Sequence, residues 1–136
     1  MSRRPEGGDK VPDDQDVVWY HGSPLKLAML REGSTITMWR DLARVFSHKP
    51  PIVCITDEET LQHNGNRPGY LYRIDEVVGP EDVIPHPRTT MRPGDEWLTT
   101  RELRLRLLGE TEVRAEEFLT ETDIAALLQR RDDIAG

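Results

Sequence analysis

The chain has 136 residues, with 25 acidic and 18 basic side chains, a formal net charge of −7 and 36% hydrophobic residues. This length suits one compact domain with its own core, and the acidic balance argues against long nucleic acid, whose binding rests on Lys and Arg contacts to phosphate. The single Cys54 excludes an internal disulfide and a CxxC-type metal site. The chain shows neither a signal peptide nor an apolar run of about 18 residues, so we expect a cytoplasmic protein without a membrane span.

The first sixteen residues differ in composition from the rest of the chain. Between Met1 and Asp16 nearly every residue is charged, Gly, Pro or Gln, and Val11 is an exception. Such a segment buries too little apolar surface to offset the entropy of ordering it, so we expect a flexible tail. Residues 17–136 are then expected to form a single domain.

The first half of that domain alternates short strands with one helix. Residues 17–20 form an apolar, β-prone run that leads into a predicted turn at 21–24, and residues 33–37 form a second predicted strand. Between residues 40 and 48, Leu42, Val45 and Phe46 have the spacing of one helical face, and two prolines at 50 and 51 end this predicted helix.

The second half is richer in strands. We predict strands over 52–55, 69–74, 96–100 and 103–108, a polar loop over 57–68 and an irregular loop over the Pro- and Gly-rich stretch 79–94. A helix is predicted over 121–131, where Thr120 and Asp123 have the spacing of a capping box. Strands outnumber helices in this order of elements, which predicts an α+β fold.

Several short motifs occur in the order found in one enzyme superfamily. They are Tyr20-His21-Gly22-Ser23, then Ile36-Thr37 ahead of Ala43, then Gly69-Tyr70-Leu71-Tyr72, and finally Glu96-Trp97-Leu98 followed by Thr100-Arg101-Glu102. This order resembles the ADP-ribosyltransferase superfamily, and in particular small rifampin ADP-ribosyltransferase-like enzymes. The resemblance covers roughly residues 19–110 and implies two small, mainly antiparallel sheets with few short helices, which together form a cleft for NAD.

The resemblance also implies which residues would bind NAD. His21 matches a histidine that bonds a ribose hydroxyl, and Gly22 matches a glycine whose backbone bonds the nicotinamide carboxamide. A residue without Cβ lets a planar ligand lie against the backbone, which suits Gly22 to this position. The same motif and the middle strand supply the other candidates, and Lys49 and Arg88 are single cations that the phosphates of NAD would attract. The remaining candidate NAD-binding residues are Tyr20, Ser23, Ser34, Thr35 and Tyr72.

An enzyme of this kind needs a carboxylate beside the reacting ribose. Cleavage of the nicotinamide–ribose bond passes through an oxocarbenium-like state, as glycoside hydrolysis does, and a carboxylate stabilises that developing cation. Glu96 is the first candidate because Glu96-Trp97-Leu98 resembles the Glu-Tyr-Ile context of poly-ADP-ribose polymerases. Asp82 is second, because rifampin-type enzymes carry an Asp in the loop after their Gly-Ile-Phe strand, and Glu102 is third.

One position departs from the family pattern. The middle strand of these enzymes usually carries a Tyr that stacks on nicotinamide, and the corresponding residue here is Thr35. Ser34-Thr35 is similar instead to the Ser-Thr-Ser strand of arginine-specific toxins, which have Arg where this chain has His21. Trp39 and Tyr72 are candidates to supply the missing ring. The departure leaves open whether the chain is catalytic.

Three functions therefore compete. The first is an NAD-dependent ADP-ribosyltransferase, with NAD as co-substrate and an unidentified small-molecule or macromolecular acceptor. The second is a non-catalytic NAD-binding or interaction module on the same fold. The third is an RNA 2′-phosphotransferase-like enzyme, against which the net charge of −7 argues because that reaction relies on several arginines and a basic surface. The histidines at 48, 63 and 86 lack the spacing of a metal site, so we expect no metal.

Overall fold

The computed structural model describes residues 17–56, 58–89 and 91–135, with the side chains of the last helix described as far as Gln129. The tail predicted for residues 1–16 lies outside these ranges. The fold is α+β, as predicted, and the described residues form two α-helices and sheets whose strand pairs are all antiparallel. The helical segments are α1 (Arg40–Phe46), α2 (Glu121–Ala135) and two 3-10 turns, η1 (Pro80–Asp82) and η2 (Ala115–Glu117). The strands are β1 (Tyr20–Ser23), β2 (Met29–Leu30), β3 (Thr35–Ile36), β4 (Val53–Ile55), β5 (Leu61–His63), β6 (Gly69–Ile74), β7 (Val83–Pro85), β8 (Trp97–Thr99) and β9 (Leu103–Thr111).

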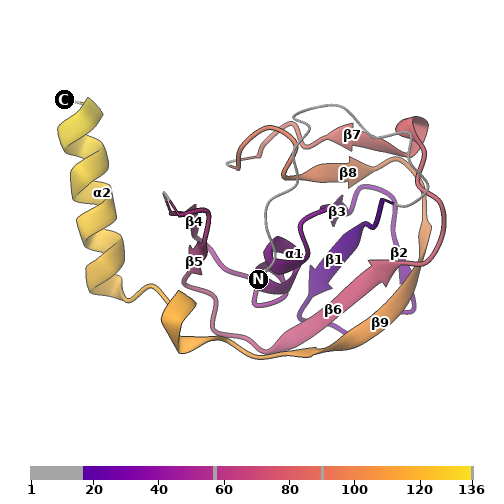
Figure 1. Cartoon of the computed structure of the whole chain (residues 1–136), viewed down its shortest axis with the longest axis horizontal. Coiled ribbons are helices and arrows are strands. Elements are labelled where there is room, and N and C mark those ends of the chain that lie inside the picture. The colour runs from indigo at the N-terminus through magenta and orange to yellow at the C-terminus, as the bar shows by residue number, and fades with distance from the viewer. Residues whose placement is uncertain (1–16, 57, 90, 136) are drawn as a thin grey trace.

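The described strands form three sheets. A four-stranded sheet has the order β1-β6-β9-β2, a three-stranded sheet has the order β3-β8-β7, and β4 and β5 form a hairpin. Figure 1 shows the four-stranded sheet curving below the three-stranded one, with α1 beside β1 and the hairpin beyond α1. The first two sheets are joined where Tyr20, at the start of β1, and Thr37, directly after β3, exchange two backbone hydrogen bonds of 2.7 and 3.0 Å.

The main core lies between these two sheets. Trp19 and Trp97 meet edge to face, with ring centroids 5.9 Å apart and ring planes at 87°. Such an edge-to-face contact stabilises the fold beyond the contribution of the area that the two rings bury. It joins the residue before β1 to β8. The other buried members of this core are Leu30, Ile36, Ile74, Val83 and Leu103.

A second core holds α1 against the β4–β5 hairpin. Two residues of the predicted face of α1, Leu42 and Val45, are buried against Trp39 and Leu61, whereas the third, Phe46, is only partly buried. On the same helix, the guanidinium of Arg44 donates two hydrogen bonds of 2.8 and 2.6 Å to the carboxylate of Glu117. This nearly buried pair ties α1 to the segment that follows β9.

The last helix stands apart from both sheets. Figure 1 shows α2 at the far left, connected to the body through η2. Its start is fixed by the predicted capping box, in which Thr120 N–H donates to the Asp123 carboxylate at 3.0 Å and Asp123 N–H donates to Thr120 Oγ1 at 3.1 Å. None of the helices in the described ranges has the length and apolar character to cross a membrane.

The structure corrects several predicted boundaries. The first strand is 20–23 rather than 17–20, so the predicted turn at 21–24 is largely strand, paired with residues 70–73 of β6. The predicted loop 57–68 contains β5, and the predicted loop 79–94 contains η1 and β7. In β5 the inward positions are Leu61 and His63, and a buried histidine gives no apolar alternation that sequence reasoning would recognise. β2, which pairs with the start of β9, was not predicted.

Candidate functional site

A cleft opens where β1 and β3 separate. Among the described residues, the backbone hydrogen bonds between β1 and the β3 segment are those of the Tyr20–Thr37 pair, and β3 itself pairs through its other edge with β8, where Thr35 lies opposite Leu98. The edge of β1 beyond Tyr20 therefore has no strand beside it. The cleft formed there has a volume of about 440 Å³, which lies within the usual range for small-molecule sites.

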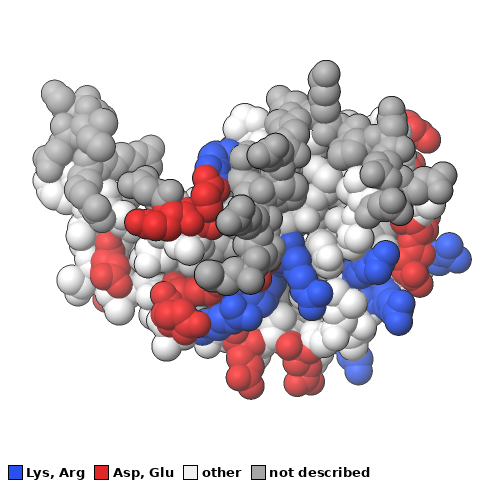
Figure 2. Space-filling model, viewed as in Figure 1, with Lys and Arg blue, Asp and Glu red and all other residues white. Residues whose placement is uncertain are grey.

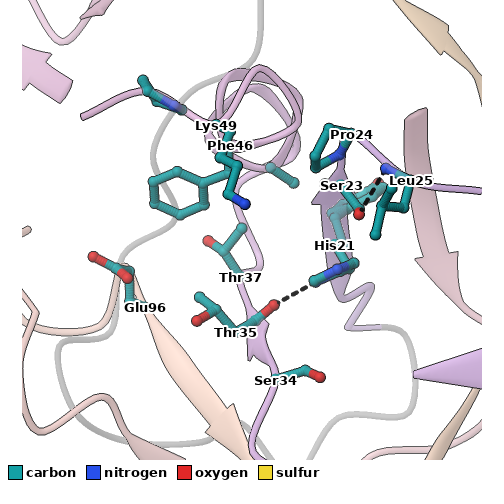
Figure 3. Close-up of a pocket in the computed structure, with 14 residues that line it drawn as sticks. His21, Ser23, Pro24, Leu25, Ser34, Thr35, Thr37, Phe46, Lys49 and Glu96 are labelled. Atoms are coloured by element: carbon teal, nitrogen blue, oxygen red, sulfur yellow. Dashed lines mark hydrogen bonds between the residues drawn. The ribbon is translucent and has the colours of Figure 1, made fainter. Parts of the chain in front are cut away.

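Of the seven NAD-binding candidates from the two strands and Tyr72, together with the first two candidate carboxylates, seven of nine line this cleft, and the candidate cation Lys49 lines it as well. Figure 3 shows His21 and Thr35 on one side, Phe46 and Lys49 at the end of α1, and Glu96 facing them across the opening. The candidates that line the cleft are Tyr20, His21, Gly22, Ser23, Ser34, Thr35 and Glu96.

The imidazole of His21 is held in one orientation. Its Nδ1 lies 2.7 Å from the carbonyl oxygen of Thr35, and because a carbonyl only accepts, Nδ1 carries the proton. Burial lowers the pKa of His21 below its ordinary value, against the opposing effect of this hydrogen bond. A neutral imidazole with Nδ1–H leaves the lone pair of Nε2 as an acceptor, suited to a hydroxyl of a bound ligand.

Behind His21 lies Tyr72, whose ring centroid is 6.4 Å from that of the imidazole. The Tyr72 hydroxyl accepts a 2.7 Å hydrogen bond from Leu27 N–H and donates a 3.1 Å bond to the Leu25 carbonyl. Tyr72 is only 1% exposed and does not line the cleft. Tyr72 therefore supports His21 and residues 25–27, and its ring does not face the cleft, where a ligand would stack.

Gly22 is required by the packing of α1. A Cβ added at Gly22 would lie 1.7 Å from the carbonyl oxygen of Ala43 and 2.8 Å from the backbone nitrogen of Ser47. The glycine therefore lets helix and strand backbones approach each other, which is a different reason from the ligand contact that its sequence motif implied. This close approach is also what brings the end of α1 to the cleft.

The backbone of Gly22 nevertheless faces the cleft. The Trp19 carbonyl accepts from Ile74 N–H on β6, whereas the N–H and carbonyl of Tyr20 bond the backbone of Thr37, the residue after β3. Because backbone groups of successive strand residues point to opposite edges, those of Gly22 point to the same side as those of Tyr20. There the edge is open, so Gly22 presents one donor and one acceptor, as an amide ligand would require.

Glu96 enters the cleft from the start of β8. The register of β3 and β8 sets Ile36 against Trp97, so the next position along puts Glu96 opposite Thr37. Trp97 points into the core, and strand alternation turns Glu96 to the other face, toward the cleft. Its carboxylate accepts a 2.6 Å hydrogen bond from the hydroxyl of Thr89.

The remaining lining candidates are tied to the chain by local bonds. Ser23 Oγ accepts from Leu25 N–H at 3.0 Å, and Ser34 Oγ donates to the Arg31 carbonyl at 2.6 Å. The ring of Tyr20 has the guanidinium carbon of Arg40 5.9 Å from its centroid, a distance at which cation–π attraction operates.

Asp82, the second candidate carboxylate, lies outside the cleft. Its oxygens accept from Arg101 at 2.8 and 3.3 Å and from Gly79 N–H at 2.8 Å. The hydrogen bond from Arg101 is the main reason that the pKa of Asp82 lies below its ordinary value. These contacts make Asp82 the anchor of η1 to the end of β8. Glu102 and Arg88 do not line the cleft either.

Two further residues line the cleft: Phe46, which gave no signal as a site residue in the sequence, and Lys49, which the sequence offered as a cation for the phosphates of NAD. Phe46 has the helical spacing of a core residue, yet as the last residue of α1 it lines the cleft, whereas Trp39 is 1% exposed in the second core. Lys49 lines the cleft and has a left-handed backbone conformation, with φ of 53°, between the end of α1 and Pro50. Within the described ranges, no three His, Cys, Asp or Glu side chains are grouped to hold a metal ion.

No protein-family model, curated protein or solved structure matches this chain.

Proposed function

We propose that the chain has an ADP-ribosyltransferase-like fold and transfers ADP-ribose from NAD to an acceptor, releasing nicotinamide. The observation that carries the proposal is the meeting of His21, the open backbone edge of Gly22 and the carboxylate of Glu96 in one cleft. The sequence motifs that suggested NAD binding come from separate parts of the chain, and the fold brings three of them together between two sheets. NAD is the co-substrate in this proposal.

Each of these groups has a distinct role in binding. The open donor and acceptor of Gly22 pair with the carbonyl and amino groups of the nicotinamide carboxamide. The free Nε2 of His21 accepts a hydrogen bond from a ribose hydroxyl, because Thr35 holds the proton on Nδ1. Phe46 supplies an aromatic side chain at the cleft, where Thr35 replaces the usual Tyr.

Glu96 carries the chemistry in this proposal. The bond between ribose C1′ and the nicotinamide nitrogen breaks, and its electron pair leaves with nicotinamide. Glu96 stabilises the positive charge that develops on the ribose, and an acceptor nucleophile then bonds C1′ and gives up its proton to solvent. A carboxylate at this place interacts more strongly with the transition state than with bound NAD, so it lowers the barrier to cleavage.

The test compares two carboxylates of the chain by nicotinamide release from NAD. Glu96→Gln keeps the size of the side chain and loses its charge, so we expect NAD to bind while turnover falls about a hundredfold to a thousandfold, roughly 3–4 kcal/mol. Asp82→Asn is the matched control, because Asp82 lies outside the cleft. Loss of turnover in Asp82→Asn with turnover retained in Glu96→Gln would move the chemistry to the loop acid.

A non-catalytic NAD-binding module is the second candidate, and Thr35 is the observation that favours it. Without a Tyr on β3, the nicotinamide has less aromatic surface around it than the family pattern gives. Wild-type protein that binds NAD and releases no nicotinamide with varied acceptors would support this second function. The phosphotransferase alternative has less support, because Figure 2 shows basic groups interspersed with acidic ones on the face in view.

A further inference from the structure

The hydroxyl of Thr89 makes the one hydrogen bond by which a described side chain fixes the Glu96 carboxylate. We propose that Thr89 is a positioning residue that holds this carboxylate toward the cleft. The proposal deepens the proposed function and rests on it for its effect on turnover. The effect of Thr89 on the position of the Glu96 carboxylate does not depend on the proposed function.

The Thr89 hydroxyl donates to the Glu96 carboxylate, which only accepts, and a second contact occupies the hydroxyl oxygen as an acceptor. Met91 N–H donates to Thr89 Oγ1 at 3.0 Å, and the hydroxyl hydrogen donates to Glu96 Oε1 at 2.6 Å. Thr89 therefore acts as a donor, and Oε1 is the acceptor. The bond holds Oε1 and thereby limits rotation of the Glu96 carboxylate.

The turn that carries Thr89 is anchored to the residue it positions. Directly after β7, His86 N–H donates to the backbone carbonyl of Glu96 at 3.1 Å. Thr89 N–H then donates to the His86 carbonyl at 3.4 Å, which closes a ring of contacts through the side-chain bond back to Glu96. The distance between Thr89 and Glu96 is thus set by the β7–β8 pair rather than by a free loop.

This arrangement matters because a glutamate has three side-chain torsions. An untethered carboxylate at the edge of a cleft samples several rotamers, and only some of them point at a bound ribose. Electrostatic stabilisation of a transition state depends on groups that are already oriented before the reaction. Thr89 removes part of that rotamer freedom in the free protein.

The experiment uses three variants of the full chain. Thr89→Val keeps the shape and removes the hydroxyl, whereas Thr89→Ser keeps the hydroxyl. Thr100→Val is the matched control, since the Thr100 hydroxyl donates to the Glu81 carbonyl at 2.7 Å and Thr100 does not line the cleft. Crystal structures of each variant report the position of Glu96, and kinetics with NAD report kcat separately from the Kd for NAD.

In the crystal of Thr89→Val we expect the Glu96 carboxylate to leave its wild-type position or to occupy several, and in Thr89→Ser and Thr100→Val to keep it. An unmoved Glu96 in Thr89→Val would overturn the proposal, whatever the activity.

In solution we expect the kcat of Thr89→Val to fall about ten- to a hundredfold with an unchanged Kd for NAD, whereas Thr89→Ser should keep the wild-type kcat. If Glu96 has moved in Thr89→Val and kcat is unchanged, the effect on turnover is overturned, and with it the role of Glu96 in the proposed function. A wild type that releases no nicotinamide would count against the proposed function alone, and the crystal structures would still decide the role of Thr89.

Discussion

The close approach of α1 to β1 at Gly22 predicts a large loss of stability in Gly22→Ala. The added Cβ would lie 1.7 Å from the carbonyl oxygen of Ala43, whereas real Cβ contacts are essentially never under 3.0 Å. The obstacles are backbone atoms, so no side-chain rotation relieves the clash, and helix and strand must move apart. Overpacking of a core commonly costs about 1–3 kcal/mol, and we expect at least about 3 kcal/mol here.

Gly33→Ala is the control for the Gly22→Ala measurement. Gly33 has a φ of 81°, and no atom lies within 4 Å of the Cβ that alanine would add, so this variant bears only the cost of a left-handed conformation, about 1 kcal/mol. Thermal or urea unfolding followed by circular dichroism gives both values. A Gly22→Ala protein that loses no more stability than Gly33→Ala would refute the contact between α1 and β1, and with it the geometry of the cleft.

Three further predictions concern stability. Burial lowers the pKa of both His48 and His63, whose rings stack with centroids 5.4 Å apart, so the unfolded chain binds more protons. We therefore expect the contribution of the two histidines to the free energy of unfolding to be complete above a pH of about 6.5 and to fall as the pH drops toward their folded pKa values. Urea titrations at several pH values should show a smaller decline in His48→Gln than in the wild type. Arg44→Met leaves the Glu117 carboxylate unpaired and nearly buried, so unfolding should become easier by about 3 kcal/mol, with much of that loss recovered when Glu117 is also replaced by Leu. Tyr72→Phe should cost about 1–2 kcal/mol through its two lost hydrogen bonds and leave the Kd for NAD unchanged, and a weaker Kd would return Tyr72 to the binding site.

The elements that the sequence predicted well are those with a strong local pattern. The strand at 69–74 and the helix at 40–48 follow from alternating or helically spaced apolar residues, and both are present with the helix ending at Phe46. The hairpin strand β5 was missed because its inward residues include His63. The strand β2 has only two residues, too few for any periodicity to appear.

The sequence predicted the part of the candidate site whose residues are adjacent in the chain. It did not predict contacts between distant residues, which depend on the tertiary fold. Residues 20–23 line the cleft together because they form one strand beside it. Asp82 was the second candidate carboxylate from the sequence, and only the fold pairs it with Arg101, nineteen residues later. Thr89 reaches Glu96 through a turn whose shape no local pattern encodes.

The proposed function requires NAD to occupy the cleft between β1 and β3, and a crystal structure of the protein with NAD tests this most directly. We expect the nicotinamide carboxamide against the backbone of Gly22, a ribose hydroxyl on Nε2 of His21, and the carboxylate of Glu96 facing ribose C1′. NAD bound elsewhere on the protein, or a cleft without NAD at a concentration that saturates binding in solution, would contradict the central claim.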